Sequence, residues 1–288
     1  MQQWQIGQVK ITRVVEMQVA GGTRFLLPQA TPEAVAPIDW LAPHFVDANG
    51  KLIMSIHALI IETPTRKIMV DTCIGNDKER NVPGWNKLQL PFLADLAKAG
   101  YPRETIDTVL CTHLHVDHVG WNTMLVDGQW IPTFPHARYL IADKEFQYWD
   151  AGDDKDGFGD IMGDSVRPVY DAGLVDLVDV NARLCDEVSL VPTPGHTPGH
   201  ISVLIESQGV KALITGDSFH HPCQMAHVDW ASSADYDPQA STATRENMLR
   251  DYADSGVLII GTHFATPTAG HIRQNDGSYW FDVASQAG

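Results

Sequence analysis

Four side chains of metal-ligand type lie within six residues of one another in the segment THLHVDHVGWN, residues 112–122. They are His113, His115, Asp117 and His118. A tetrahedral zinc site that does chemistry keeps one position open, so it takes only three protein ligands. Four candidate ligands are too many for one such ion. The alternative is that this segment supplies half of a site that binds two ions.

The spacing of the four residues divides them into two pairs. His113 and His115 are two residues apart, so in an extended chain their side chains leave on the same face. Asp117 and His118 follow at the point where the chain is expected to turn from strand into helix. This turn would aim the second pair in another direction. We therefore expect one ion at His113 and His115 and a second ion at Asp117 and His118.

Two ions need more ligands than this segment supplies, and an acidic residue between them would help to hold two cations together. Three further candidates each follow an apolar, strand-like stretch, namely His196 after SLVPTPG, Asp217 after ALITG and His263 after VLIIGT. Open α/β folds place their sites at the ends of their strands, so these side chains can reach one edge of the sheets.

The elements that must position these residues occur twice. The stretch from His57, HALIIETPTRKIMVDT, and the stretch from His200, HISVLIESQGVKALITGDS, both run His, strand, turn, strand, Asp. This echo indicates two related halves, each a sheet with helices outside. No linker separates the halves, so we expect one domain over residues 1–288. Periodicity predicts helices at 90–97, 144–150 and 242–254, and further strands at 105–112, 137–143 and 257–263.

The composition favours a small-molecule substrate over a macromolecular partner. The chain has 36 acidic against 20 basic residues and a net charge of -16, which repels nucleic-acid phosphates and anionic lipids. We expect neither nucleic acid nor a membrane as partner. The four cysteines lack CxxC spacing and the N-terminal residues lack a signal-peptide pattern, so we expect reduced thiols and a cytoplasmic location.

Taken together, the motifs resemble those of the metallo-β-lactamase fold superfamily. The resemblance lies in THLHVDH at 112–118, PGHTPGH at 194–200, TGD at 215–217 and GTH at 261–263, with MVDT at 69–72 also typical. It implies an α/β fold, a four-layer αββα sandwich of two mixed β-sheets flanked by helices. It also assigns the ligands: His113, His115 and His196 to the first metal, Asp117, His118 and His263 to the second, and Asp217 to a bridge between them.

The cofactors that the resemblance implies are two divalent metal ions. Zinc suits histidine and aspartate ligands, and iron, manganese and cobalt suit them as well. Two ions that share a water make hydroxide available near neutral pH and polarise an electrophile, which implies hydrolysis. Asp117 is the candidate catalytic residue, which would orient the nucleophile or move a proton.

Comparison with the branches of the superfamily narrows the substrate. True β-lactamases lack an aspartate at the position of Asp217, and the flavodiiron branch has Glu in place of His115. Glyoxalase II carries a helical C-terminal domain, whereas only residues 264–288 follow His263. The lead-in at 99–123 and the GDSFHHP segment resemble the lactonase and organophosphate-hydrolase branch.

We therefore expect a lactonase for acyl-homoserine lactones or related esters. The alternatives are a phosphotriesterase or arylesterase of the methyl-parathion-hydrolase type, a glyoxalase II-like thioesterase, and a metal-binding module without activity.

The substrate-binding wall is expected in the loops. The apolar loop at 21–45 is either a lid over the site, a packed connector or an interface, and the last leaves a homodimer open. His200 is expected to make a structural hydrogen bond, while Asp71 is expected to brace a ligand histidine. The candidate wall residues, for each of which ordinary packing is the alternative, are Phe25, Leu26, Trp121, Phe219, His220 and His221.

Overall fold

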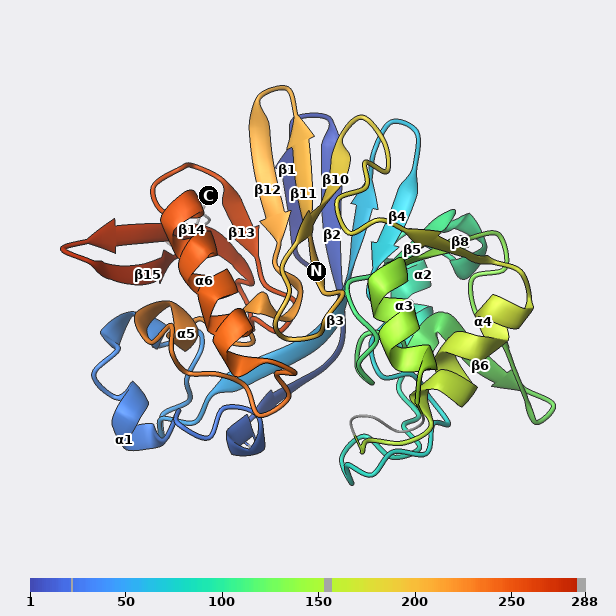
Figure 1. Cartoon of the computed structure of the whole chain (residues 1–288), viewed down its shortest axis with the longest axis horizontal. Coiled ribbons are helices and arrows are strands. Elements are labelled where there is room, and N and C mark those ends of the chain that lie inside the picture. Colours follow the sequence, from blue (N-terminus) through green and yellow to red (C-terminus); the bar gives the residue numbers. More distant parts are fainter. Residues whose placement is uncertain (22, 153–156, 284–288) are drawn as a thin grey trace. The chain divides into compact units, whose positions relative to one another are not determined.

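The computed structural model describes residues 1–21, 23–152 and 157–283, and the chain divides into two compact units. Unit 1 comprises residues 1–16 and 56–182, and unit 2 comprises residues 17–55 and 183–288. Two long strands, β2 (Val9–Ala20) and β3 (Ile53–Glu62), supply residues to both units (Figure 1). The expectation of a single domain over residues 1–288 stays a prediction.

Unit 1 is built on a mixed sheet of seven strands. The predicted hairpin is confirmed, because β3 pairs with β4 in antiparallel fashion, whereas β4, β5, β8 and β9 run parallel. All four residues of β5 are buried, as expected for a parallel strand covered on both faces. The strand order is β1 (Gln3–Ile6), β2, β3, β4 (Lys67–Val70), β5 (Thr108–Cys111), β8 (Arg138–Ala142) and β9 (Val175–Val178).

The helices of unit 1 include two that the periodicity predicted. The helix expected at 90–97 is α2 (Phe92–Lys98), and Gly100 follows it with a φ of 94°, the left-handed conformation that ends helices. The helix expected at 144–150 is α3 (Asp143–Asp150). This unit also contains the turn η3 (Arg103–Thr105), the π-helical turn η5 (Met162–Val166) and the helix α4 (Arg167–Asp171).

The helix expected after His118 is wrong. The chain forms only a 3-10 turn, η4 (Gly120–Asn122), and then enters the hairpin of β6 (Thr123–Val126) and β7 (Gln129–Pro132). The backbone of Gly120 lies so close to Ile74 that a Cβ at this position would be 1.7 Å from the Ile74 carbonyl oxygen. This close approach holds the chain in a tight turn and directs it away from a helical path.

Unit 2 is built on a second mixed sheet, of six strands. Its β11–β12 hairpin is the counterpart of β3–β4, which confirms the echo between the two stretches of sequence. Strands β12 and β13 run parallel, and the other neighbours are antiparallel. The order is β10 (Val188–Pro192), β11 (Ile201–Ser207), β12 (Val210–Ile214), β13 (Leu258–Ile260), β14 (Ala269–Asn275) and β15 (Ser278–Asp282).

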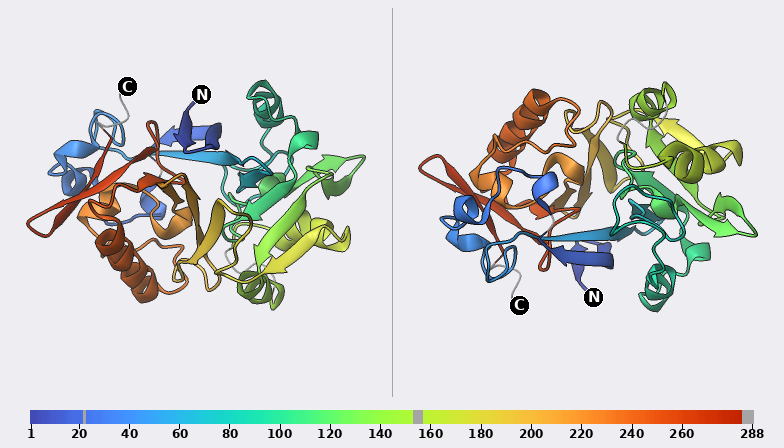
Figure 2. Two further views of the ribbon diagram at one scale, coloured as in Figure 1. Left: turned by 90° about the horizontal axis from the view of Figure 1, so that it is seen from above. Right: turned by 90° about the horizontal axis from the view of Figure 1, so that it is seen from below.

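The long helix of unit 2, α6 (Pro238–Tyr252), begins four residues before the predicted Thr242. Asp237 caps its first turn by accepting hydrogen bonds from the backbone N–H groups of Gln239 and Ala240. Pro238 at the first helical position has no N–H to leave unpaired. In both views of Figure 2 this orange-red helix lies alongside the red strands, and its Met248 joins their buried cluster.

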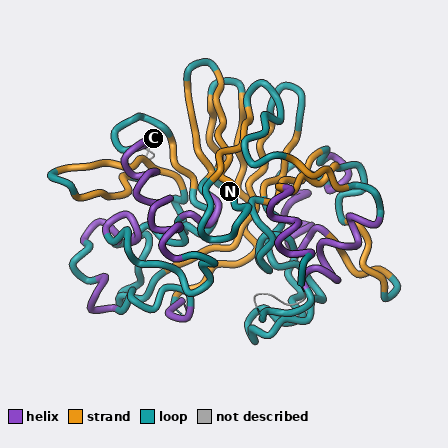
Figure 3. Tube along the Cα trace, viewed as in Figure 1, coloured by secondary structure: helices purple, strands orange, loops and turns teal. Residues whose placement is uncertain are grey.

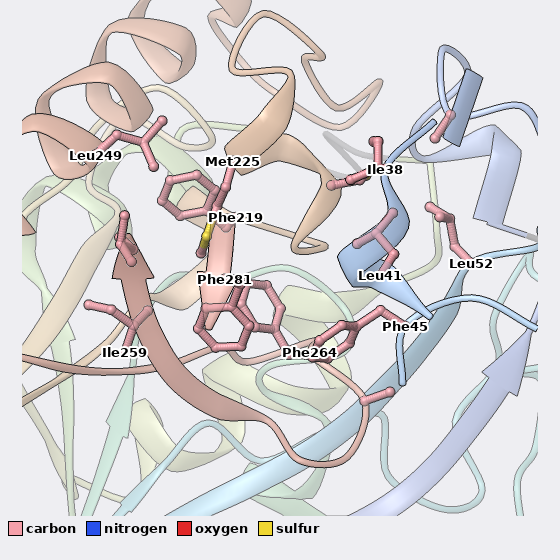
Figure 4. Packing of buried hydrophobic residues seen from close by; sticks show 14 of the residues in the cluster. Ile38, Leu41, Phe45, Leu52, Phe219, Met225, Leu249, Ile259, Phe264 and Phe281 are labelled. Carbon is pink, nitrogen blue, oxygen red and sulfur yellow. The ribbon is translucent and has the colours of Figure 1, made fainter. Parts of the chain in front are cut away.

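The apolar loop at 21–45 packs into the core of unit 2. It contains η1 (Thr23–Phe25), α1 (Pro32–Val35) and η2 (Asp39–Leu41) among loop residues (Figure 3). Figure 4 shows Ile38, Leu41 and Phe45 among the buried side chains of this unit. The ring of Phe45 lies 5.9 Å from that of Phe281, centroid to centroid. These contacts favour the packed connector for this part of the loop.

The four cysteines are all free thiols, and Cys73, Cys111 and Cys223 are buried. The expectation that they form no disulfide framework is therefore confirmed. None of the helices in the described part of the chain combines the length and the apolar character that crossing a membrane requires.

Candidate metal centre

The candidate ligands of unit 1 lie in the loop that follows the buried end of β5. The ring of His113 lies 4.7 Å from that of His115 and 4.0 Å from that of His118, centroid to centroid. All three histidines are buried, and Asp117 is partly exposed. Oδ1 of Asp117 lies 3.7 Å from Nε2 of His118. The loop therefore gathers the four predicted side chains of this unit into one cluster.

Asp71, at the end of β4, braces this loop. Its carboxylate accepts hydrogen bonds of 2.8 Å from the backbone N–H and the hydroxyl of Thr112. It also accepts one of 2.8 Å from Nδ1 of His118. A carboxylate only accepts, so Nδ1 of His118 carries a proton and Nε2 is left to present a lone pair. The sequence predicted this bracing role for Asp71.

Two buried glutamates hold the same loop, and the sequence analysis did not find either. Glu16 accepts hydrogen bonds from the backbone N–H groups of Ile74 and Gly75 and from Nε1 of Trp121. Burial raises the pKa of Glu16 to about 7, although these three donors oppose the shift. Glu145 of α3 accepts from the backbone N–H of Leu114, between two candidate ligands.

The candidate ligands of unit 2 converge on one carboxylate oxygen. Oδ2 of Asp217 lies 3.5 Å from Nε2 of His196 and 3.2 Å from Nε2 of His263. A further imidazole, that of His220, has its Nε2 3.3 Å from the same oxygen. All four side chains are buried. His196 lies in the loop after β10 and His263 in the loop after β13. Asp217 lies in the 3-10 turn η6 (Gly216–Ser218) after β12, and His220 follows that turn.

The proton positions in unit 2 favour a cation at this cluster. Nδ1 of His263 lies 3.0 Å from the carbonyl oxygen of Ser55, and Nδ1 of His196 lies 2.9 Å from Oδ1 of Asp235. Both partners only accept, so each Nδ1 carries a proton, and in its neutral form each ring turns the lone pair of Nε2 toward the Asp217 carboxylate. Acceptors that face one another at this distance repel unless a cation lies between them.

The distances also fit a metal ion. With ligand bonds of about 2.1 Å, neighbouring ligand atoms of a tetrahedral site lie about 3.4 Å apart. The observed separations of 3.2–3.5 Å around Asp217 match that spacing. The donor set of neutral imidazoles and a carboxylate suits zinc and other divalent transition metals. His196, Asp217 and His220 of unit 2 therefore form a group able to hold an ion.

The matches to known proteins settle the family. The model of the metallo-beta-lactamase superfamily matches residues 54–263. The chain belongs to the metallo-beta-lactamase superfamily. It is therefore a hydrolase of that superfamily, and the predicted fold class is confirmed.

Among the curated relatives of this superfamily member is an N-acyl homoserine lactonase from a Bacillus species. The two are 25% identical over 200 residues, which cover 62% of this chain and 73% of the lactonase. The structure of AidC, a dizinc quorum-quenching lactonase in complex with a product, is similar with a TM-score of 0.79 at 21% identity, covering 98% of this chain and 96% of AidC. The hydrolase AbOPH is similar with the same TM-score at 24% identity, covering 98% of this chain and 96% of AbOPH.

His200 plays the structural role that the sequence predicted. Its Nε2 accepts a 2.8 Å hydrogen bond from the backbone N–H of Asp217, and its Nδ1 lies 3.0 Å from the carbonyl oxygen of Thr193. Gly216 makes this contact possible, because a Cβ there would lie 2.5 Å from Nε2 of His200. The ring therefore holds the turn that carries Asp217 in this superfamily member.

The predicted wall residues lie in different surroundings. Among the described residues neither ring nitrogen of His220 has a hydrogen-bond partner, and burial lowers its pKa. His221 has both nitrogens in hydrogen bonds, to the carbonyl oxygen of Phe45 and the backbone N–H of Cys223, which favours packing. Phe219 is fully buried in the unit 2 cluster, which also favours packing.

Of the other three candidates for the substrate-binding wall, one is packed in the protein interior and two keep exposed surface. Trp121 stacks on Phe92 and donates to Glu16, so its contacts favour packing. Phe25 is 50% exposed and Leu26 is half-buried, and the backbone carbonyls of both accept hydrogen bonds from Ser233. Phe25 and Leu26 thus keep apolar surface that a ligand could contact.

Proposed function

We propose that this hydrolase is a binuclear, metal-dependent lactonase that opens acyl-homoserine lactones or related cyclic esters. The convergence of His196, His220 and His263 on Asp217 is the observation that carries the metal-dependent part. The curated lactonase relative and the likeness to AidC support the lactone substrate.

The proposed ligand sets are those that the family resemblance implies, with zinc as the favoured metal. His113, His115 and His196 would hold the first ion, Asp117, His118 and His263 the second, and Asp217 would bridge them. The clustering of the ligand side chains within each unit, with Nδ1 of His118, His196 and His263 already engaged, supports this assignment. The two ions would supply Lewis acidity and lower the pKa of a water.

The side chains then have separate tasks in lactone hydrolysis. Asp117, which keeps part of its carboxylate exposed, would orient the attacking water and take up its proton. His220, buried with its Nε2 3.3 Å from Oδ2 of Asp217, would form part of the wall beside the bridging carboxylate. Phe25 and Leu26 would contact the apolar acyl chain.

Replacing Asp217 with alanine tests the metal centre. We expect the Asp217→Ala variant to lose bound metal and lactone turnover together, because three imidazoles then lack the carboxylate on which they converge. Metal content by mass spectrometry and hydrolysis of an N-acyl homoserine lactone measure the two. Asp186→Ala, which removes a side chain that is 96% exposed in the same unit, serves as the control. Retention of metal and activity in Asp217→Ala would remove Asp217 from the site.

A substrate panel tests the reaction. N-acyl homoserine lactones of several chain lengths are compared with a phosphotriester, S-lactoylglutathione and nitrocefin. Preference for the lactones supports the proposal, and preference for the thioester would instead indicate a glyoxalase II-like enzyme. Preference for the phosphotriester would indicate the methyl-parathion-hydrolase type. Two bound ions without hydrolysis of any of these compounds would refute the enzymatic proposal.

The cellular setting and the assembly are proposals of the same kind. The four free thiols support a reducing compartment, which is the cytoplasmic location that the sequence predicted. Exposed Phe25, at the start of the 21–45 loop, leaves apolar surface for a second copy of the chain as well as for substrate. Light scattering on the purified protein distinguishes a homodimer from a monomer.

A further inference from the structure

The segment from Ser232 to Thr244 in unit 2 holds the loop that carries His196. The backbone N–H groups of Tyr236 and Asp237 donate to the carbonyl oxygens of His196 and Gly195, both at 2.9 Å. The hydroxyl of Thr244 donates to the carbonyl oxygen of Pro194 at 2.6 Å. Three successive carbonyls of the loop are thus bound by one segment.

The two chain segments lie too close for a side chain between them. Gly195 has a φ of 131°, and a Cβ built on it would lie 2.2 Å from the backbone nitrogen of Ser241. Ser241 is in the first turns of α6, so the start of this helix is packed directly on the loop. Backbone contacts with this segment therefore hold the loop, in addition to the Thr244 hydroxyl.

Asp235 of the same segment also binds the ring of His196. Its Oδ1 accepts from Nδ1 of His196 at 2.9 Å, and its Oδ2 accepts from the backbone N–H of Ser232 at 3.0 Å. The Asp235 side chain is fully buried. Both carboxylate oxygens are engaged, so the carboxylate plane and the imidazole that it binds have one orientation.

A buried arginine balances the charge of this carboxylate. Nη1 of Arg245, on α6, lies 3.7 Å from Oδ2 of Asp235, and neither side chain is exposed. Nε of Arg245 donates to the carbonyl oxygen of Val228. Its two terminal nitrogens donate to the hydroxyls of Ser241 and Thr242. A buried carboxylate needs such a partner, since an unpaired buried charge is strongly destabilising.

We propose that Asp235 is a positioning residue for the metal centre, and that Arg245 holds it in place. Asp235 fixes the proton of His196 on Nδ1, so that Nε2 presents its lone pair on the side of Asp217. This inference rests on the proposed function, because it takes His196 to be a metal ligand. Asp235 would act on the ion only through His196, and it is not itself a proposed ligand.

The variant Asp235→Asn tests the proposal through metal affinity. The amide keeps the size of the carboxylate but has one oxygen for two donors, the His196 ring and the Ser232 N–H. We expect the affinity for zinc, measured by competition with a chromophoric chelator, to fall about 10–100-fold. Asp251→Asn, which changes an exposed carboxylate on α6, is expected to leave the zinc affinity unchanged.

The wild-type protein provides a readout that does not depend on how the variant folds. Long-range ¹⁵N–¹H spectra of the zinc-loaded protein report which ring nitrogen of each histidine carries the proton, and His196→Gln assigns the signal. We expect His196 to be protonated on Nδ1. A proton on Nε2 would overturn the proposal even if Asp235→Asn failed to fold.

The outcomes also separate this proposal from the one on which it rests. If the wild-type protein binds no stoichiometric metal, the proposed function fails. If the wild-type protein binds metal and Asp235→Asn binds it equally tightly, only the role of Asp235 fails.

Discussion

The ring nitrogens of three candidate ligands are controlled by three different acceptors. Nδ1 of His118 binds Asp71, that of His196 binds Asp235 and that of His263 binds the carbonyl oxygen of Ser55. The effect is the same in each case, because the acceptor holds the proton on Nδ1 and leaves Nε2 for coordination.

The variant Asp71→Asn tests whether the charge of the Asp71 carboxylate, and not only its size, is needed to hold His118. Asp71 accepts three hydrogen bonds, two from Thr112 and one from His118, and an amide places an NH₂ group against one of these donors. We expect zinc affinity to fall about 10–100-fold, measured by chelator competition. Asp171→Asn, at an exposed carboxylate of unit 1, is the matched control. Equal affinity in both variants would contradict the bracing role.

At the scale of elements, the candidate ligands follow strands and depend on the close approach of backbone segments. The loop after β5 is pressed against the segment after β4 at Gly120 and Gly75, and Glu16 ties both segments to β2. In unit 2, Gly195 and Gly216 allow close contacts with Ser241 and His200, at which a Cβ would lie 2.2 Å and 2.5 Å from the neighbouring atom. These glycines fit because any side chain would push the two segments apart.

The variant Gly120→Ala tests this dependence. Its Cβ would lie 1.7 Å from the Ile74 carbonyl oxygen, so the loop must shift. We expect the free energy of unfolding to fall by about 3 kcal/mol, measured by chemical denaturation. The control is Gly84→Ala, whose Cβ would have nothing within 4 Å, with a change below about 0.5 kcal/mol. Similar stabilities for the two variants would show that the loop tolerates the displacement.

At the scale of the whole molecule, the chain combines a surplus of acidic residues with a few buried cationic side chains. The net charge is -16, yet Lys78 is fully buried in unit 1. Its ammonium donates to the hydroxyl of Thr123 and the carbonyl oxygen of Asp164, and it lies 3.7 Å above the Trp130 ring. Burial lowers the pKa of Lys78 to about 7, and the charge of Asp164 offsets only part of this shift.

This shift predicts how the stability of the folded chain depends on pH. Between about 7 and 10.5, the unfolded chain keeps the Lys78 proton and the folded chain does not. The unfolded state therefore binds more protons, and the contribution of Lys78 to the free energy of unfolding rises with pH across this window. Below pH 7 both states are protonated, so this contribution stays constant at its least favourable value.

The free energy of unfolding of the wild type and of Lys78→Met is measured by chemical denaturation at several pH values. A metal chelator is present throughout. The stability of the wild type minus that of the variant should increase from pH 7 to 10.5, by at most about 1.4 kcal/mol per pH unit. Lys144→Met, at an exposed lysine, should give a flat difference. A flat difference for Lys78→Met as well would mean that the buried amine keeps its ordinary pKa.

The sequence by itself was enough to predict candidate ligands and the elements that precede them. Apolar runs predicted the hairpins at β3–β4 and β11–β12, because strand formation depends on local alternation and burial. The spacing of the histidines in THLHVDH pointed to a metal site, and the family model confirms the superfamily. The start of α6 was missed by four residues because its cap depends on Asp237 and Pro238, which precede the periodic pattern.

Only the tertiary structure decided what surrounds those residues. Asp235 lies 39 positions from His196, and Glu16 lies 105 positions from Trp121, so no local pattern connects them. No local pattern predicted the turn at Gly120 either. There the close contact with Ile74 is incompatible with the helix that the sequence predicted. Ligand identity is a property of single side chains, whereas the proton, orientation and charge of each ligand depend on groups that folding brings to it from distant parts of the chain.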